Sequence, residues 1–388
     1  MSATRGAPVE LGFATRPPSA WRLRAANFPS KVGGRPAWLG RDPLPGLAEQ
    51  LACGRCSNTC AFLLQVYAPL PNRDDCFHRS LLLFCCRDPT CYAELHDPRC
   101  LRVVRCQLPR RNPFYSFDPP PDDPPSGTTA AAAVAAAAAE SEEAGEAWSH
   151  RLCRVCGGPG PKACSRCHTA AYCGKRHQAM DWKAGHKHEC GHAAEPTQTP
   201  PERDHGFLFP ELEILTEAED DDDDDEEVED EQKEEEAPSD AASQGVLKTA
   251  TESELDEQQL EAVARRESVD DRAFRLFKEK IARDPKQVLR YSREGQPLWV
   301  SSEHVATASD IPACSCGSPR SFEFQVMPQL LSELHVDSLS ASIDWGTLVV
   351  YTCSRSCTPR DGPHAYVSEF VWKQDFVHSA GGLRQQRQ

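Results

Sequence analysis

The sequence predicts a mostly β protein: a duplicated β-rich domain of two related halves, interrupted by a small Cys/His unit and a disordered acidic segment. Three observations lead to this prediction. Short runs of aromatic and β-branched residues, typical of strands, lie toward both ends of the chain, at 62–68, 80–86, 321–327 and 347–353. The two end regions also repeat each other in spacing. Between them lie a dense cluster of cysteines and histidines and a run of acidic residues.

Length and charge limit the number of domains and the part of the chain that can fold. A chain of 388 residues corresponds to two or three domains rather than one large core. The formal net charge of −16 is concentrated in one place, because residues 217–236 hold 16 Asp and Glu against Lys233 and sum to −15. Such a composition cannot bury enough apolar surface to form a core, which predicts disorder there.

Nothing in the sequence indicates export or membrane insertion. Met1–Pro8 is polar and small rather than an apolar leader, and the alanine run at 130–139 is too short to span a bilayer. We therefore expect a soluble intracellular protein with no membrane partner. In a reducing compartment the 19 cysteines are expected to be metal ligands or buried thiols rather than disulfides.

We expect seven segments along the chain. The predicted helix places Leu260, Val263, Phe274, Phe277 and Ile281 on one face. The segments are a β-rich half at 1–118, a low-complexity linker at 119–147, the Cys/His unit at 148–192, an acidic disordered segment at 193–255 that contains an apolar stretch at 206–215, the helix at 256–285, the second β-rich half at 286–378 and a tail at 379–388.

The duplication is visible as three equal spacings. A Trp precedes a Cys by 15 residues, a Cys precedes a Gln by nine, and a second Cys precedes a second Gln by 21, in both halves. The anchors are Trp38, Cys53, Cys56, Gln65, Cys86 and Gln107 in the first half, and Trp299, Cys314, Cys316, Gln325, Cys353 and Gln374 in the second. We expect both tryptophans to be core residues and the Cys/His unit to be an exposed insertion between the halves.

Each half also has four cysteines at spacings that suit a zinc clip joining two loops. The expected ligand sets are Cys53, Cys56, Cys86 and Cys91 in the first half, and Cys314, Cys316, Cys353 and Cys357 in the second. The second set begins with C-x-C, which is a poorer chelate than C-x2-C. Both sets also remain open to interpretation as buried thiols, which is the interpretation we adopt for Cys60, Cys76, Cys85, Cys100 and Cys106.

The Cys/His unit holds eight ligand-type residues within 38 positions. Four paired short spacings predict two closed tetrahedral zinc sites, and a unit this small depends on the metal to fold. The ligands in chain order are Cys153, Cys156, Cys164, Cys167, Cys173, His177, His186 and Cys190.

The run from Cys153 to Cys190 resembles a MYND-type zinc finger. The resemblance implies a cross-brace, in which Cys153, Cys156, Cys173 and His177 hold one zinc, and Cys164, Cys167, His186 and Cys190 hold the other. His177 stands where the family usually has Cys, and His188 competes with His186. The resemblance also implies that Tyr172 and Trp182 are small-core residues and that the finger binds short, often proline-containing peptides.

The finger is basic, with eight Lys and Arg against two acidic residues between 150 and 192. A basic finger can meet nucleic acid, an acidic partner or the chain's own acidic run. We regard nucleic acid as the less favoured partner, because the cross-brace does not present a base-reading helix.

The whole chain resembles the programmed cell death protein 2 family. The matching segments are 9–13, 28–39, 62–71, 107–116, the finger, 207–214, 310–316, 322–331, 342–346 and 369–375. The resemblance implies a non-enzymatic chaperone that captures one basic small-subunit ribosomal protein, the universal S-five protein, as it is synthesised. It also implies a role in 40S ribosome biogenesis, a nuclear and cytoplasmic location, and a link to cell proliferation and cell death.

Two hypotheses follow. In the first, the β domain binds the ribosomal protein, and the acidic run either screens that cationic client or is a solvated spacer. In the second, the chain is a nuclear MYND adaptor that recruits corepressors or binds DNA in transcription and apoptosis. We do not expect an enzyme, since no G-x-S-x-G, Walker or H-E-x-x-H motif is present and a zinc with four protein ligands has no open position.

Overall fold

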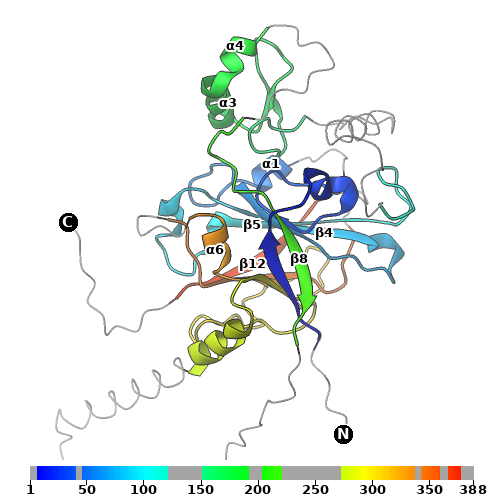
Figure 1. Cartoon of the computed structure of the whole chain (residues 1–388), viewed down its shortest axis with the longest axis vertical. Coiled ribbons are helices and arrows are strands. Elements are labelled where there is room, and N and C mark those ends of the chain that lie inside the picture. The colour runs from blue at the N-terminus through cyan, green and yellow to red at the C-terminus, as the bar shows by residue number, and fades with distance from the viewer. Residues whose placement is uncertain are drawn as a thin grey trace, which may run out of the picture.

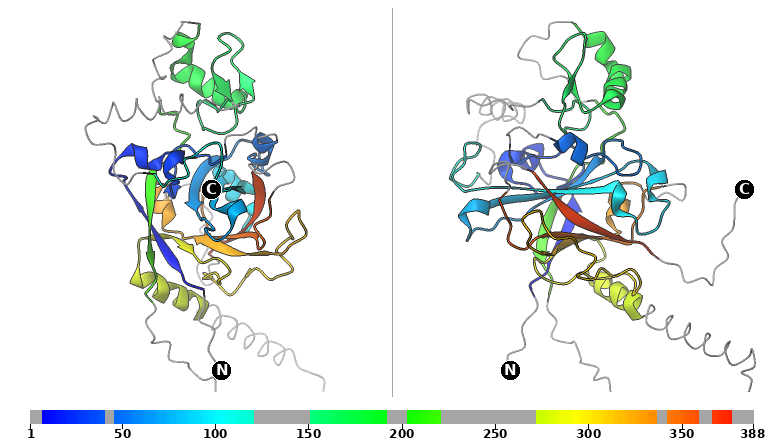
Figure 2. Two further views of the ribbon diagram at one scale, coloured as in Figure 1. Left: turned by 90° about the vertical axis from the view of Figure 1, so that its right-hand side faces the viewer. Right: turned by 180° about the vertical axis from the view of Figure 1, so that it is seen from behind.

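The computed structural model describes residues 7–40, 46–120, 151–191, 203–220, 272–336, 342–358 and 366–376. Within these ranges ten antiparallel strands close one barrel, in the order β1-β8-β2-β3-β4-β5-β12-β11-β10-β9. A separate two-stranded sheet, β6-β7, belongs to the finger. The finger lies beyond one end of the barrel, and the helix at 272–283 lies at the other end (Figures 1 and 2).

The strands form where the sequence alternates or is continuously apolar, and the helices are short. The strands are β1 Glu10–Thr15, β2 Lys31–Val32, β3 Ala61–Tyr67, β4 His78–Cys85, β5 Leu101–Leu108, β6 Lys162–Ala163, β7 Ala171–Tyr172, β8 Leu212–Ala218, β9 Gln287–Tyr291, β10 Arg320–Val326, β11 Thr347–Cys353 and β12 Val367–Gln374. The helical segments are η1 Ala20–Leu23, η2 Ala25–Asn27, α1 Leu47–Gln50, η3 Asp74–Cys76, η4 Pro89–Tyr92, η5 Pro98–Cys100, α3 Lys175–Asp181, η6 Trp182–His186, α4 Lys187–Glu189 and α6 Leu330–Glu333, with the helix at 272–283. None of the helices in the described ranges is long and apolar enough to cross a bilayer.

The duplication is present in the strand order and in the register. Strands β1–β5 and β8–β12 take equivalent places in the barrel: β2-β3-β4-β5 and β9-β10-β11-β12 are each neighbours in chain order, and the first strand of each set pairs with the other set. Phe62 of β3 faces Phe84 of β4, and Phe322 of β10 faces Tyr351 of β11. Both β3 and β10 then carry a bulge one residue later. The predicted mostly β fold of two related halves is confirmed.

The two halves exchange their first strands. β1 of the first half pairs with β9 of the second, and β8 of the second half pairs with β2 of the first. β1 and β8 also pair with each other, and they run side by side in Figure 1. The barrel therefore closes only when both halves are present.

The position of β8 corrects two predictions. The acidic segment predicted as disordered at 193–255 includes residues 203–220, which are folded, and the second half begins with β8 rather than at 286. Leu212 and Ile214 are buried in the main core, so a short alternating pattern outweighs the acidic composition around it. Residues 193–202 and 221–255 lie outside the described ranges.

Other predicted boundaries fall partly outside the structure. The helix predicted at 256–285 is seen over 272–283, where Phe277 packs with Val300 and Met327 in a small separate cluster. Residues 256–271, most of the linker at 119–147 and the tail at 379–388 lie outside the described residues.

Two of the repeated glutamines explain why their spacing is the same in both halves. Gln65 accepts a hydrogen bond from the backbone N–H of Ala37 at 2.9 Å, and Gln325 accepts one from Leu298 at 2.6 Å. Each side-chain amide also donates to the backbone carbonyl of the residue from which it accepts, Ala37 for Gln65 and Leu298 for Gln325. Both of these residues directly precede the repeated tryptophan. A buried amide that satisfies both backbone groups holds this loop against the barrel.

The halves are also joined by buried ion pairs. Arg79 of β4 makes a bidentate pair with Glu323 of β10, with N–O distances of 2.7 and 2.9 Å, and Arg105 of β5 pairs with Glu369 of β12 at 2.7 Å. Burial alone would raise the pKa of Glu323, but attraction and hydrogen bonding from Arg79 outweigh it and lower that pKa to about 2.

Removing the carboxylate should destabilise the barrel. We expect Glu323→Gln to lower the free energy of unfolding at pH 7 by about 3–5 kcal/mol, because Arg79 is left buried without its partner. Because the pKa of Glu323 is lowered, its stabilisation is complete above the ordinary value of 4.5 and is lost as the pH falls toward about 2. The gap between variant and wild type should therefore shrink on acidification in urea unfolding followed by tryptophan fluorescence.

The double variant Arg79→Met/Glu323→Leu is the control for this pair. Replacing both charges removes the buried guanidinium, while Arg293, the second partner of Glu323, is partly exposed and keeps a contact with Glu294. We therefore expect the double variant to recover most of the lost stability. A Glu323→Gln protein as stable as wild type at pH 7 would contradict this account of the pair.

Candidate metal centres

The structure brings the sixteen predicted ligands together in four groups. In each group one ligand atom per residue lies within 4.8 Å of the others. A tetrahedral zinc with Zn–S bonds of 2.3 Å needs sulfur atoms about 3.8 Å apart, whereas a disulfide has an S–S distance of about 2 Å. The S–S separations, given below, are 3.6–3.9 Å and match the tetrahedral value. All 19 cysteines lie in the described ranges, and none forms a disulfide.

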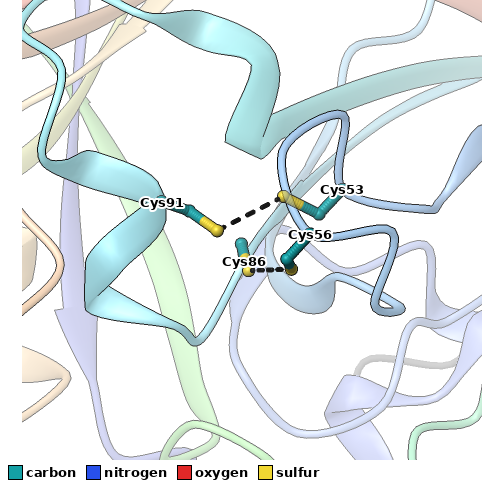
Figure 3. A group of neighbouring side chains, drawn as sticks. All are labelled: Cys53, Cys56, Cys86 and Cys91. Carbon is teal, nitrogen blue, oxygen red and sulfur yellow. Dashed lines mark hydrogen bonds between the residues drawn. The ribbon is translucent and has the colours of Figure 1, made fainter.

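The first-half group joins two loops of the barrel (Figure 3). Cys53 and Cys56 lie just after α1, and Cys86 and Cys91 lie after β4 and within η4. Cys53 is 3.8 Å from Cys91, and Cys56 is 3.6 Å from Cys86. Three of the four are buried and Cys56 is partly exposed, so the group has the burial and geometry of a structural zinc site.

The second-half group has the same arrangement. Cys314 is 3.6 Å from Cys357, and Cys316 is 3.7 Å from Cys353. The C-x-C pair therefore reaches the same geometry as the C-x2-C pair. Cys316 is exposed, and a hydrogen bond from Ser318 lowers the pKa of its thiol to about 6, which favours the thiolate that binds metal.

The finger holds the remaining two groups in the cross-braced order. In the first, Nδ1 of His177 is 3.5 Å from Cys153 and 3.0 Å from Cys173, and Cys156 is 3.9 Å from Cys173. In the second, Cys164 is 3.8 Å from Cys190, and Cys167 is 3.6 Å from Nε2 of His186. His186 is buried and His188 is exposed, which places His186 and not His188 in the group.

The same tight turn recurs in all four groups. The residue that follows the second cysteine has a left-handed backbone, and its N–H donates to the carbonyl of the first cysteine. This turn points both thiols to one side. The four residues are Ser57, Gly157, His168 and Gly317. Glycine is suited to this conformation because it has no Cβ, so a glycine directly after a cysteine pair, as at Gly157 and Gly317, is a sequence signal for this turn.

The remaining cysteines are packing residues. Cys60, Cys76, Cys85, Cys100 and Cys106 are buried, and none of them belongs to a ligand group in the described ranges. The Cys60 thiol lies close to the first-half group, but its Sγ is 3.7 Å from the carbonyl oxygen of Cys100.

Buried Asp181 holds the inner part of the finger together. It accepts a hydrogen bond from the Tyr172 hydroxyl at 2.7 Å and lies 3.0 Å from Nε2 of His205. Tyr172 is buried, as expected. Trp182 is exposed, so the expectation that it is a core residue is wrong: its ring stays on the finger surface beside His186, since Asp181 and Tyr172 already occupy the interior.

The finger packs on the first half rather than standing free as an exposed insertion. The Trp38 indole donates to the carbonyl of Gly157 at 2.7 Å, and Arg35 donates to the carbonyl of Arg154 at 2.8 Å. A narrow crevice between them is lined by residues of both units, including Leu51, Phe62, Phe84, Cys156 and Pro159. Trp38 is thus a core residue, as expected, and also an anchor for the finger.

Residues 203–209 tie the finger to the barrel a second time. Arg203 pairs with Glu189 of α4, and the Phe207 ring packs edge-on against His177, with centroids 4.2 Å apart. Phe209 then packs under Arg87 of the first half. The chain continues from there into β8, so the zinc-binding finger and the strand that closes the barrel are consecutive parts of one packed segment.

Three family models match the chain. The model described as Programmed cell death protein 2, N-terminal domain covers residues 8–122, and Programmed cell death protein 2, C-terminal putative domain covers 271–375. The MYND finger model covers 153–190, so this segment is a zinc finger of the MYND type.

Named relatives extend these matches. The chain is 49% identical to mouse Programmed cell death protein 2 over 97% of its own length and 98% of the relative's, and 48% identical to the bovine protein over 98% and 100%. It is 41% identical to Probable 20S rRNA accumulation protein 4 of Schizosaccharomyces pombe, over 24% of this chain and 25% of that protein. No solved structure matches.

The anchor role of Trp38 can be tested against its repeat. Trp38→Phe keeps the ring but removes the N–H donor to Gly157, so we expect a loss of about 1 kcal/mol and faster hydrogen exchange of residues 151–191. Trp299→Phe is the matched control, because no hydrogen bond of its indole is found among the described residues. Unchanged exchange of the finger in Trp38→Phe would show that this contact does not hold it.

Proposed function

The chain belongs to the programmed cell death protein 2 family, and on this basis we propose that it is a dedicated chaperone for a basic small-subunit ribosomal protein. The proposed client is the universal S-five protein, bound as it is synthesised. The observation that carries the proposal is the similarity to a fission yeast relative named as a 20S rRNA accumulation protein, a name that points to ribosome production. The role would be in 40S biogenesis and thereby in cell proliferation.

The charge distribution supports a cationic client. The run at 217–236 sums to −15, and its first two residues are the last two of β8. An anionic segment beside a folded surface raises the rate at which a cationic protein is captured. We place the protein in both cytoplasm and nucleus, where a ribosomal protein is made and assembled.

We propose that all four groups bind zinc, one ion each. The support is their common geometry and the common turn after each first cysteine pair. A site with four protein ligands has no position for a substrate or an activated water, so the metals would be structural. The matching family and finger models are not those of enzyme families, and we propose that the protein has no catalytic activity.

A second candidate function is supported by the finger surface. Both of its acidic residues, Asp181 and Glu189, are paired with arginines, whereas seven basic side chains are exposed: Arg151, Lys162, Arg166, Lys175, Arg176, Lys183 and Lys187. This surface suits an acidic peptide, a corepressor or nucleic acid. The protein would then be a nuclear MYND adaptor or DNA-binding regulator of transcription and apoptosis.

Metal content tests the zinc proposal. We expect four zinc ions per chain by mass spectrometry of the purified protein, one for each of the four groups. Cys56→Ser and Cys316→Ser should each lose one ion, because three ligands hold zinc poorly. Cys76→Ser, which replaces a buried thiol outside the groups, should keep all four. A wild-type value of two would restrict zinc to the finger.

Affinity purification of the intact chain from cells, with nuclease and moderate salt, tests the two functions. We expect one basic small-subunit ribosomal protein at near-equal stoichiometry. Dominant corepressors, or binding that disappears with nuclease, would favour the adaptor instead.

Surface variants separate the functions better than deletion, because deleting the finger would remove its packing on the barrel. Lys175→Glu/Arg176→Glu/Lys183→Glu should leave capture of the ribosomal protein within about twofold, since exposed charges contribute little to packing. Loss of the client in this variant, with four zinc ions retained, would contradict a binding site on the β domain.

A further inference from the structure

The outer side of strands β10, β11 and β12 carries a row of aromatic side chains. We call Trp299, Phe322, Tyr351, Phe370 and Trp372 the aromatic face. Phe322, Val349 and Tyr351 form its buried base, and the other three rings pack on them and remain partly exposed. Neighbouring rings are in contact, with centroids 6.2 Å apart for Phe322 and Tyr351 and 6.3 Å apart for Phe370 and Trp372.

The corresponding side of the first half is fully covered. Trp38, Phe62 and Phe84 occupy the positions of Trp299, Phe322 and Tyr351 in the repeat, and each is 1–2% exposed. The finger provides this cover, and its Gly157 carbonyl accepts a hydrogen bond from the Trp38 indole N–H. Trp299 is only half-buried, contrary to the expectation that it is a core residue. The indole N–H of Trp299 has no acceptor among the described residues. The two halves thus present the same kind of face, and among the described residues only the face of the first half has a covering unit.

The border of the aromatic face is negatively charged. Glu303 and Asp310 are exposed on the loop that packs Ala306 and Ile311 against the face. Neither carboxylate forms an ion pair with a described residue. Two arginines of the same half are already neutralised, since Arg293 pairs with Glu323 and Arg320 with Glu369. A partner that approaches this side meets aromatic rings and two carboxylates that have no ion-pair partner among the described residues; Asp310 accepts hydrogen bonds from Thr307 alone.

We propose that the aromatic face binds an arginine-containing segment of the basic client, an inference that rests on the proposed chaperone function. A guanidinium stacks on aromatic rings and pairs with carboxylates in bidentate geometry, so one residue type satisfies both features. The Trp299 N–H would donate to a backbone carbonyl of that segment, as Trp38 does to Gly157. The chain's own acidic run and nucleic acid are disfavoured occupants, because both would meet the carboxylates with like charge.

Charge reversal at the border provides the first test. Full-length wild type and Glu303→Lys/Asp310→Lys are compared for binding of the purified ribosomal S-five protein by surface plasmon resonance at moderate salt. We expect the variant to bind about tenfold more weakly. Asp74→Lys/Asp118→Lys makes the same charge change at two exposed carboxylates of the first half, in η3 and in the loop after β5, and should bind within about twofold of wild type. Equal loss in both variants would reduce the effect to general electrostatics and overturn the proposal.

Ring removal and crosslinking provide the second test. Trp299→Ala/Phe370→Ala should weaken binding by about tenfold while unfolding temperature and zinc content show whether the variant is folded. A photoreactive phenylalanine at position 370, in otherwise wild-type protein, should crosslink to an arginine-containing stretch of the client. Crosslinks to the chain's own acidic run or to RNA, or to none of these, would overturn the assignment of the occupant.

The outcomes separate this inference from the function on which it rests. If wild type fails to bind the ribosomal protein at all, the proposed chaperone function is wrong. If wild type binds it and both aromatic-face variants bind equally well, the client is held elsewhere and only the aromatic-face inference is wrong.

Discussion

Closure of the barrel by exchanged strands is the constraint on which the rest of this structure depends. β8 must lie between β1 and β2, and β1 must lie between β8 and β9. Neither half can satisfy the backbone hydrogen bonds of its own edge without a strand from the other, and unpaired edges are costly or prone to aggregate. The two halves are therefore one folding unit, although they derive from a repeat.

That constraint explains where the finger lies. The chain must leave β5, form the finger, and return to place β8 in the barrel. Residues 203–209 make this return by packing first on the finger through Phe207 and then on the first half through Phe209. The finger is consequently part of the barrel's structural support, and metal binding within it stabilises the segment that leads into the closing strand.

The repeat has diverged in what covers its two halves. Both halves keep the four-cysteine group, the bulge and the hydrogen bonds between a glutamine and the backbone. These features stabilise loops that lie next to the barrel. The cover over the outer aromatic side chains is not kept. The first half seals this side with the finger and the second leaves it partly open. Buried pairs such as Arg79–Glu323 and Arg105–Glu369 join the halves, so the open side is presented on a rigid support.

By itself the sequence determined the features that depend on local spacing: the two halves, the eight finger ligands, both sets of four cysteines in the halves, and the strands with clear patterns. Metal ligands close in sequence are brought together by single turns, and the period of two in a strand needs no distant partner. Only the tertiary structure decided the features that depend on distant contacts. The role of β8, hidden in acidic surroundings, follows from its pairing with β1 and β2. The same distant packing buries Trp38 and leaves its repeat Trp299 half-open, because only the first is covered by the finger.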